Sequence, residues 1–388
     1  MKIGIDARFS NESGVGRYIR NLIKNLSEID AVNNYVLFVS PQFDNKIIKD
    51  KKNWKTITTN IRWHSLNEQL KLPNLINKEN LDLMHFPYFS VPILYRRPYV
   101  VTIHDLILHH FATGEATTKS QLLYFLKLQA YKFIMQTSAQ KAKKIITVSS
   151  STKEEIIKHL KVSPEKIAIT YEGVELPVTV NQNKTISSKN PNKYLLHVGN
   201  LYPHKNMNIV LHAIKKIKDE DNISINLSIV GKEDHFYFKY KRKVEELGLE
   251  NQVKFLGEVT DQTLQNLYKN ALAYISPSLM EGFDLPAAEA MANNCLTLLS
   301  DIPAHREICQ EAAVYFSLED PKDLIKKIKE VYRFHSCHSR EGGNPDPSIE
   351  KEKYTQKINK GHAIAQKFTW KKMAQETKEI YENSLSLR

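Results

Sequence analysis

Short apolar segments alternate with longer amphipathic ones along most of the chain. Lys2–Ile5 is an apolar run of strand length that ends at Asp6, and apolar residues at helical spacing follow it. Similar runs recur at Tyr35–Val39, Asp82–His85, Tyr99–Ile103, Ile145–Val148, Ile167–Tyr171, Tyr194–Val198, Ile223–Val230, Val253–Phe255, Ala271–Ser276, Leu296–Leu299 and Ala313–Phe316. This alternation favours parallel sheets with helices on both faces. The sequence therefore predicts an α/β protein whose ligands bind beyond the carboxyl ends of the strands.

A polar segment divides this pattern into two halves. Residues 177–192 are rich in Asn and Ser and favour turns, which is typical of a linker. Because 388 residues exceed the size of a single core, we predict two doubly wound, Rossmann-like domains, 1–176 and 193–369, facing each other across a cleft. Residues 335–350 (HSCHSREGGNPDPSIE) interrupt the second half with two prolines and two glycines, so we expect an exposed insertion there.

The segment Ser278–Asn294 (SLMEGFDLPAAEAMANN) combines a polar loop with the start of a helix. Pro286 suits the first helical position, and alanines follow it. Free backbone N–H groups and the helix dipole make such a junction an anion site. Glu281 in the loop and Glu289 one turn into the helix could present two carboxylates to one ligand. A surface loop with solvated glutamates is equally compatible with this spacing.

Three other strand ends carry candidate chemistry. The glycine loop Gly199–Asn206 places Lys205 at a helix start, which suits a diphosphate, although a solvated lysine is the alternative. Gly14 and Gly16 open the first helix, but a dinucleotide fingerprint would require a third glycine, at Ile19. His104 follows the run Tyr99–Ile103; a histidine there is more often structural, and His109 and His110 are interpreted as local surface.

Charge and cysteine content narrow the class of protein. The net charge is +12, with lysine in excess, which favours anionic partners such as nucleotide-linked substrates or lipid surfaces. No nucleic-acid motif is present, so we expect no nucleic-acid partner. Three cysteines form no metal or disulfide spacing, as in a reducing cytoplasm. No apolar run approaches the roughly 20 residues of a membrane span, and no signal peptide is recognisable. We expect a cytoplasmic protein, with association at the inner face of the plasma membrane.

Glu281 and Glu289, separated by seven residues within SLMEGFDLPAAEAMA, resemble the signature of the retaining glycosyltransferases of family 4, which have the GT-B fold. The resemblance implies that Glu281 contacts the donor sugar and Glu289 the nucleotide ribose. It also implies that the amides of Gly282 and Phe283 hold the diphosphate. Asp284 stands where the family usually has glycine, and its charge would weaken anion binding unless the side chain turns away. The usual Gly-x-Pro turn after the helix is replaced by Asn294-Cys295-Leu296.

Other parts of the chain extend the resemblance. VVTIHDL is similar to the strand end whose histidine, here His104, contacts the donor sugar. Lys205 matches the lysine of a basic pair, and His204 stands where arginine is common. Gly14 and Gly16 match a glycine loop beside the donor diphosphate. The final segment, 370–388, resembles the helix that packs back on the first domain.

The resemblance implies transfer of a sugar from a nucleotide donor with retention, with Glu281, His104 and Lys205 as catalytic residues and without metal or cofactor. Our best interpretation of the partners is GDP-mannose as donor and a glycan or polyprenyl-linked acceptor, in lipopolysaccharide or O-antigen synthesis. His85–Pro87 and nearby aromatic residues could line the acceptor side: Tyr88, Phe89, Tyr95 and Tyr99. A nucleotide-sugar epimerase and a non-catalytic sugar-binding protein with a degenerate site remain alternatives.

Overall fold

The computed structural model describes residues 1–111, 121–176, 194–336 and 347–386. The chain divides into two compact units, one of Met1–Gly173 with Phe368–Arg388 and the other of Val174–Lys367. The expected linker, 177–192, lies outside the described residues. Among the helices described, none combines the length and apolar character that crossing a bilayer requires.

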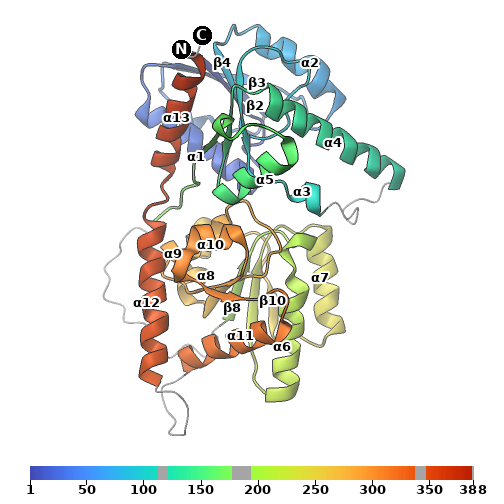
Figure 1. Ribbon diagram of the computed structural model, residues 1–388, viewed down its shortest axis with the longest axis vertical. Helices are drawn as coiled ribbons and strands as arrows, with labels where there is room; N and C mark the ends of the chain where they lie inside the picture. The colour runs from blue at the N-terminus through green and yellow to red at the C-terminus, as the bar shows by residue number, and fades with distance from the viewer. Residues whose placement is uncertain (112–120, 177–193, 337–346, 387–388) are drawn as a thin grey trace. The chain divides into compact units, whose positions relative to one another are not determined.

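Unit 1 is built on a sheet of seven parallel strands within its described part (Figure 1). The strands are β1 (Lys2–Ala7), β2 (Asn34–Val39), β3 (Trp54–Thr58), β4 (Leu83–Phe86), β5 (Tyr99–Ile103), β6 (Lys144–Thr147) and β7 (Ile167–Ile169). Their order is β3-β2-β1-β4-β5-β6-β7. Edge strand β3 was not predicted, because most residues of its sequence WKTIT are polar and only Trp54 is buried.

The helices of unit 1 are α1 (Gly14–Ile29), α2 (Leu66–Asn77), α3 (Ile107–His110), α4 (Gln121–Lys141), α5 (Ser150–Leu160) and α13 (Trp370–Ser386), with 3-10 turns at Asn45–Ile48 and Pro164–Lys166. The last helix, α13, lies beside α1, the first (Figure 1). Its Tyr381 hydroxyl is 2.6 Å from Nδ1 of His85, and Nε2 of His85 is 2.8 Å from the Thr102 hydroxyl. His85 is fully buried, so it joins α13 to the sheet, and the prediction that it lines an acceptor site is wrong.

Unit 2 contains a second parallel sheet, with six strands in its described residues and the order β10-β9-β8-β11-β12-β13. The strands are β8 (Tyr194–Val198), β9 (Asn226–Val230), β10 (Val253–Phe255), β11 (Ala273–Ser276), β12 (Thr297–Ser300) and β13 (Val314–Phe316). The helices are α6 (Met207–Asp221), α7 (His235–Glu246), α8 (Asp261–Asn270), α9 (Leu285–Ala292), α10 (Pro303–Cys309), α11 (Pro321–Ser336) and α12 (Pro347–Ala365), with 3-10 turns at Pro203–Lys205 and Gln310–Ala312.

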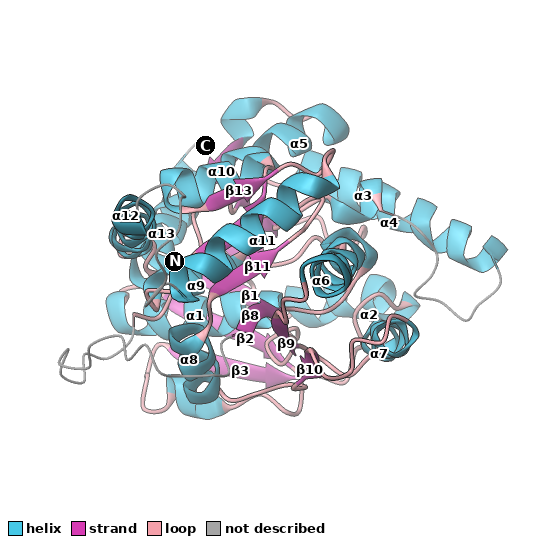
Figure 2. Ribbon diagram, turned by 90° about the horizontal axis from the view of Figure 1, so that it is seen from below, coloured by secondary structure: helices cyan, strands magenta, loops and turns pink. Residues whose placement is uncertain are grey.

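Helices cover both faces of this sheet. Figure 2 shows α6 and α7 on one side of the strands and α8 and α9 on the other. Helix α11 packs against α6, and α12 packs against α9. The two parallel sheets confirm the predicted class, two doubly wound α/β domains.

The strand order indicates where a ligand site is expected in each sheet. In each sheet, strands are added on one side of the first strand and then on its other side, so the order reverses between β1 and β4 and between β8 and β11. Loops that leave the carboxyl ends of such neighbouring strands diverge to opposite faces, and the crevice between them is where open α/β sheets bind ligands.

Helices occupy both ends of the range that was predicted to be an insertion. Helix α11 continues to Ser336, and α12 already begins at Pro347. His335 Nε2 donates a hydrogen bond to the carbonyl oxygen of Leu272 at 2.9 Å, so His335 belongs to the packed unit. Residues 337–346 lie outside the described residues.

Candidate active site

Lys205 and Glu281 meet at the reversal point of the second sheet. Lys205 ends the turn Pro203–Lys205 after β8, and Glu281 lies in the loop after β11. Lys205 Nζ donates a hydrogen bond to Glu281 Oε1 at 2.6 Å, and the side chains are only 15% and 7% exposed. The amide of Leu279 donates to the carbonyl oxygen of His204 at 2.8 Å and ties the two loops together. Two predicted catalytic groups therefore form one largely buried ion pair.

Asp284 caps the helix that follows this loop. Its backbone φ of 61° is left-handed, the conformation that glycine adopts most readily and that Asp tolerates. Its Oδ1 accepts from the Tyr274 hydroxyl at 3.0 Å and from the amide of Ala287, in the first turn of α9. The side chain is buried and bonded inside the unit, at the position where the resemblance would usually imply glycine.

His305 holds the other oxygen of this carboxylate. Its Nε2 lies 2.8 Å from Asp284 Oδ2, and its Nδ1 lies 2.8 Å from the carbonyl oxygen of Ser300. Burial raises the pKa of Asp284, but the hydrogen bond and charge of His305 outweigh burial and hold that pKa well below its usual range. Sequence reasoning missed His305. Its signal was Pro303 at the first helical position directly after β12, which places the helix's first turn at the strand end beside β11.

The histidine of the predicted basic pair is neutral at pH 7. His204 is 8% exposed, and burial lowers its pKa to about 4, with the carboxylate of Glu281 opposing and the ammonium of Lys205 adding to this effect. Lys205 is therefore the cationic member of the pair at neutral pH, where the family commonly has two positive charges.

Glu289 lies in the middle of α9 and is buried. Its Oε2 accepts a hydrogen bond from the hydroxyl of Tyr268, at the end of α8, at 3.3 Å. Gly282 and Phe283 immediately precede the cap of α9, and the Phe283 side chain is 3% exposed. The roles of Glu289, Gly282 and Phe283 in donor binding stay predictions.

The ends of β8 and β9 approach so closely that side chains are excluded. A Cβ atom on Gly231 would lie 2.4 Å from the carbonyl oxygen of Gly199. Gly199 itself has a φ of +140°, a conformation that side chains disfavour. The glycine-rich strand ends beside Lys205 thus expose backbone where a ligand phosphate could approach.

In unit 1, His104 follows β5 and uses both ring nitrogens within the unit. Nδ1 lies 3.2 Å from Glu172 Oε1, and Nε2 lies 3.0 Å from the carbonyl oxygen of Pro87. Burial lowers the pKa of His104, but the hydrogen bond and charge of Glu172, together with the Pro87 carbonyl, raise it above its ordinary value overall. A sugar hydroxyl contact would have to replace or share one of these bonds, so the catalytic role of His104 stays a prediction.

Gly14 and Gly16 differ in their surroundings. A Cβ atom on Gly16 would lie 2.8 Å and 2.9 Å from the carbonyl oxygens of Phe9 and Ser10, whereas nothing lies within 4 Å of one on Gly14. Gly16 therefore lets the first turn of α1 pack on the loop that leaves β1. The predicted contact of these glycines with a diphosphate is not decided by this packing.

Aromatic rings gather at the strand ends of unit 1. The Phe9 ring lies 4.7 Å from Trp63 and 4.8 Å from Tyr88, and the ring of His64 is stacked on Tyr88 at 5.9 Å. Of the four aromatic residues proposed for the acceptor side, Tyr95 and Tyr99 are core residues instead, since they pack on Phe86 and are 1% and 3% exposed. Trp63 and His64 were not predicted, because they follow β3, which was not predicted either.

The carboxylates of Glu281 and Asp284 and the ring of His305 place three donor atoms within 4.8 Å of one another. These carboxylates already have partners, because Glu281 pairs with Lys205 and Asp284 pairs with His305. Each carboxylate of the cluster is therefore paired with a neighbouring side chain.

Comparisons with known proteins agree with this arrangement. Residues 13–177 match the model described as Glycosyltransferase Family 4, and residues 180–336 match Glycosyl transferases group 1. The chain is 31% identical over 278 residues to the O-antigen chain mannosyltransferase RfbU of Salmonella typhimurium, covering 72% of each protein. It is 26% identical to the O-antigen chain mannosyltransferase B of Escherichia coli, covering 80% of this chain and 84% of that one.

Solved structures share the fold. The sucrose-phosphate synthase of Thermosynechococcus elongatus superposes with a TM-score of 0.75 at 16% identity over 100% of both chains. Anabaena HepE in complex with UDP and glucose superposes with a TM-score of 0.70 at 17% identity, over 99% of this chain and 100% of that one. The chain belongs to glycosyltransferase family 4 and has the GT-B fold.

Proposed function

We propose that this glycosyltransferase moves a mannosyl group from GDP-mannose to a glycan carried on a polyprenyl-linked acceptor, with retention of configuration. The observation that carries the proposal is the Lys205–Glu281 pair at the reversal point of the second sheet, directly before α9. The sugar is suggested by the relatives, two of which are named as O-antigen chain mannosyltransferases. In this proposal unit 2 binds the donor and unit 1 the acceptor.

The chemistry requires stabilisation of two charges. The leaving nucleoside diphosphate gains negative charge as the glycosidic bond breaks, and the Lys205 ammonium together with the N-terminal dipole of α9 would stabilise it. The sugar becomes oxocarbenium-like, and Glu281 would accept hydrogen bonds from its hydroxyls and favour that charge. The departing phosphate oxygen takes the acceptor's proton, so no metal ion or cofactor enters the proposal.

The aromatic cluster of unit 1 supports a sugar-binding surface for the acceptor. Trp63 is half-buried, and its ring together with those of Phe9 and Tyr88 lies beyond the ends of β1, β3 and β4. Aromatic faces bind the apolar faces of sugar rings by stacking. These rings therefore support unit 1 as the acceptor side.

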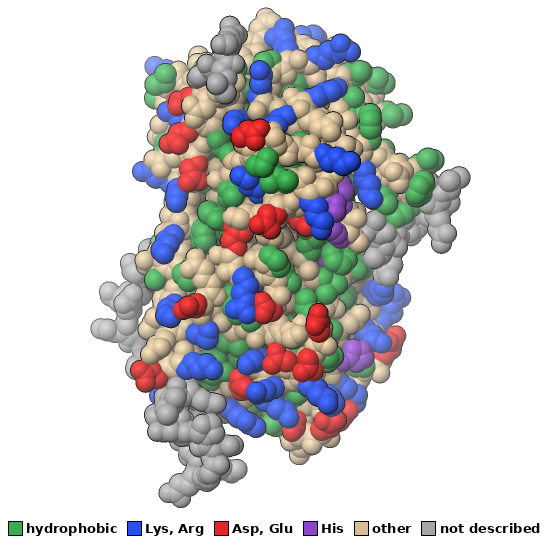
Figure 3. Space-filling model, viewed as in Figure 1, with side chains coloured by type: hydrophobic (Ala, Val, Ile, Leu, Met, Phe, Trp, Pro, Cys, Tyr) green, Lys and Arg blue, Asp and Glu red, His purple; other side chains and the backbone are tan. Residues whose placement is uncertain are grey.

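Helix α4 supports contact with an anionic membrane, where a polyprenyl-linked acceptor would lie. Its sequence contains three lysines and no acidic residue. Phe125, Leu126 and Phe133 are each more than half exposed, and Figure 3 shows apolar and basic side chains side by side along this helix. Exposed apolar side chains bind at the lipid interface, and neighbouring lysines are attracted to anionic headgroups.

A donor panel tests the proposal. The purified protein would be incubated with GDP-mannose, UDP-glucose, UDP-galactose and a synthetic polyprenyl-diphosphate oligosaccharide, and the product analysed by mass spectrometry and for anomeric configuration by NMR. Mannosyl transfer that requires the acceptor and keeps the α-configuration is expected. Efficient use of a UDP-sugar in preference to GDP-mannose, an inverted product, or interconversion of the donor without acceptor would each contradict it.

A further inference from the structure

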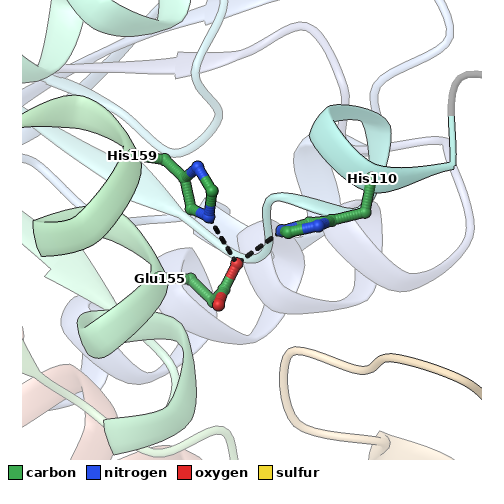
Figure 4. Close-up of side chains that lie close together, drawn as sticks. All are labelled: His110, Glu155 and His159. Carbon is green, nitrogen blue, oxygen red and sulfur yellow. Dashed lines mark hydrogen bonds and ion pairs between the residues drawn. The ribbon is translucent and has the colours of Figure 1, made fainter.

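Three metal-ligating side chains converge in unit 1, apart from any residue assigned above to catalysis. His110 ends α3, while Glu155 and His159 lie one turn apart on α5. Figure 4 shows the two imidazole rings approaching the Glu155 carboxylate from opposite sides. The sequence did not predict this cluster, because His110 was interpreted as local surface and is 45 residues distant from Glu155.

The donor atoms are already close to metal-binding separation. Glu155 Oε2 lies 2.6 Å from His110 Nε2 and 3.4 Å from His159 Nε2, and all three atoms lie within 4.8 Å of one another. Zinc bonds of about 2.0–2.1 Å in tetrahedral geometry place neighbouring ligand atoms roughly 3.3 Å apart. Binding would therefore require the first distance to open by less than about 1 Å.

One donor atom lacks a hydrogen bond in the described structure. His159 Nε2 is buried and has an ion-pair contact with Glu155 but no hydrogen-bond partner among the described residues. A buried ring nitrogen normally has a partner. A cation between the three side chains would supply one.

We propose that His110, Glu155 and His159 bind a divalent transition-metal ion of the zinc class. Two imidazole nitrogens and one carboxylate oxygen are the donors that zinc prefers. The side chains are 34%, 23% and 29% exposed, so an ion enters from solvent and a water molecule completes the coordination. Figure 3 shows histidine side chains reaching the surface of unit 1 over α3 and α5.

The ion would join α3 to α5. Helix α3 begins three residues after His104, at the end of β5, so the metal would fix the segment that follows this strand end. The site is therefore a structural cation site, independent of the proposed sugar transfer. Its occupancy would raise the stability of unit 1, because a ligand that binds only the folded state stabilises it by mass action.

The test is titration of the chelator-treated full chain with Zn²⁺, followed by calorimetry, and with Co²⁺, followed by its visible absorption. The variants are His110→Gln, Glu155→Gln and His159→Gln. Matched controls are Glu154→Gln, an exposed neighbour on α5, and His212→Gln, an exposed histidine on α6. We expect one ion per chain, an absorption band typical of four-coordinate Co²⁺ with nitrogen ligands, and affinity at least tenfold weaker in each site variant.

The controls should bind as the wild-type chain does, and Zn²⁺ should raise the thermal midpoint of the wild type but not of His159→Gln. Far-ultraviolet circular dichroism establishes that each variant is folded. Absence of stoichiometric binding in the wild type would overturn the proposal. Binding that persists unchanged in all three site variants would overturn it as well, because the ion would then be held elsewhere.

Discussion

Asp284 illustrates how a charged residue fits a position suited to glycine. Its left-handed backbone is tolerated because the side chain caps α9 and is held by Tyr274 and His305. Removing His305 would leave this carboxylate buried without its strongest partner, a change that typically costs about 3–5 kcal/mol. The network therefore fixes the backbone that leads from Glu281 into the helix.

Replacing Glu281 by glutamine should mainly lower kcat, whereas replacing Glu289 by glutamine should mainly weaken nucleotide binding. Glu281 is expected to act where charge develops, so Glu281→Gln should lower kcat about 10²–10³-fold. Glu289 is expected to bind ribose in ground and transition states alike, so Glu289→Gln should weaken nucleotide binding by roughly 1.5–3 kcal/mol. Steady-state kinetics and calorimetric titration with GDP separate the two effects.

The exposed Glu250→Gln serves as the control for both variants. Loss of GDP affinity in Glu281→Gln with unchanged affinity in Glu289→Gln would reverse the two roles. Full activity in both variants would remove this loop from the catalytic site.

The pKa of His204 predicts a pH-dependent stability. Because burial lowers the pKa of His204 to about 4, its contribution is fully present above the unfolded pKa of about 6.5 and is lost as pH falls toward the folded value. The free energy of unfolding of the wild type, relative to His204→Gln, should be constant above pH 7 and fall by up to about 3 kcal/mol toward pH 4. Denaturant titrations of both proteins at several pH values measure this difference. A difference that stays constant between pH 7 and 4.5 would show that His204 protonates freely in the folded chain.

At the scale of elements, the first turn of α1 depends on one of its two glycines. Gly16→Ala would force a Cβ against the carbonyl oxygens of Phe9 and Ser10, so we expect destabilisation by about 1–3 kcal/mol. Gly14→Ala meets open space and should leave stability unchanged or raise it by up to about 1 kcal/mol. Thermal unfolding of the two variants provides the comparison, and equal midpoints would contradict the packing role of Gly16.

The sequence was sufficient for most elements, because apolar runs, glycine loops and a proline at a helix start are local signals. It singled out Lys205 and Glu281 separately, but only the fold shows that they form an ion pair. It could not reveal which loops diverge at a reversal point, since strand order depends on contacts between distant segments. It also missed β3, whose polar residues suit an exposed edge of the sheet. The sequence also did not predict the cluster of His110, Glu155 and His159, because only the fold brings α3 close to α5.

At the scale of the whole molecule, net charge alone does not say where a membrane would bind. In the proposed membrane contact, the net charge of +12 would give a general attraction to anionic lipid, whereas helix α4 would add a defined surface of exposed apolar side chains and lysines. General attraction is screened by salt, since the Debye length is about 8 Å at physiological ionic strength. The apolar contribution is not screened, so the two sources can be separated.

Vesicle co-sedimentation tests this surface. The wild type should bind vesicles of anionic lipid more strongly than neutral ones, and binding should fall steeply with salt, because each lysine near the surface contributes about 1 kcal/mol. Replacing Phe125, Leu126 and Phe133 by serine should weaken binding at every salt concentration. Val32→Ser, which changes an 83% exposed residue in the loop between α1 and β2, should not. Equal binding of the triple variant and the wild type would exclude α4 as the contact surface, and equal binding to neutral and anionic vesicles would exclude the role of charge.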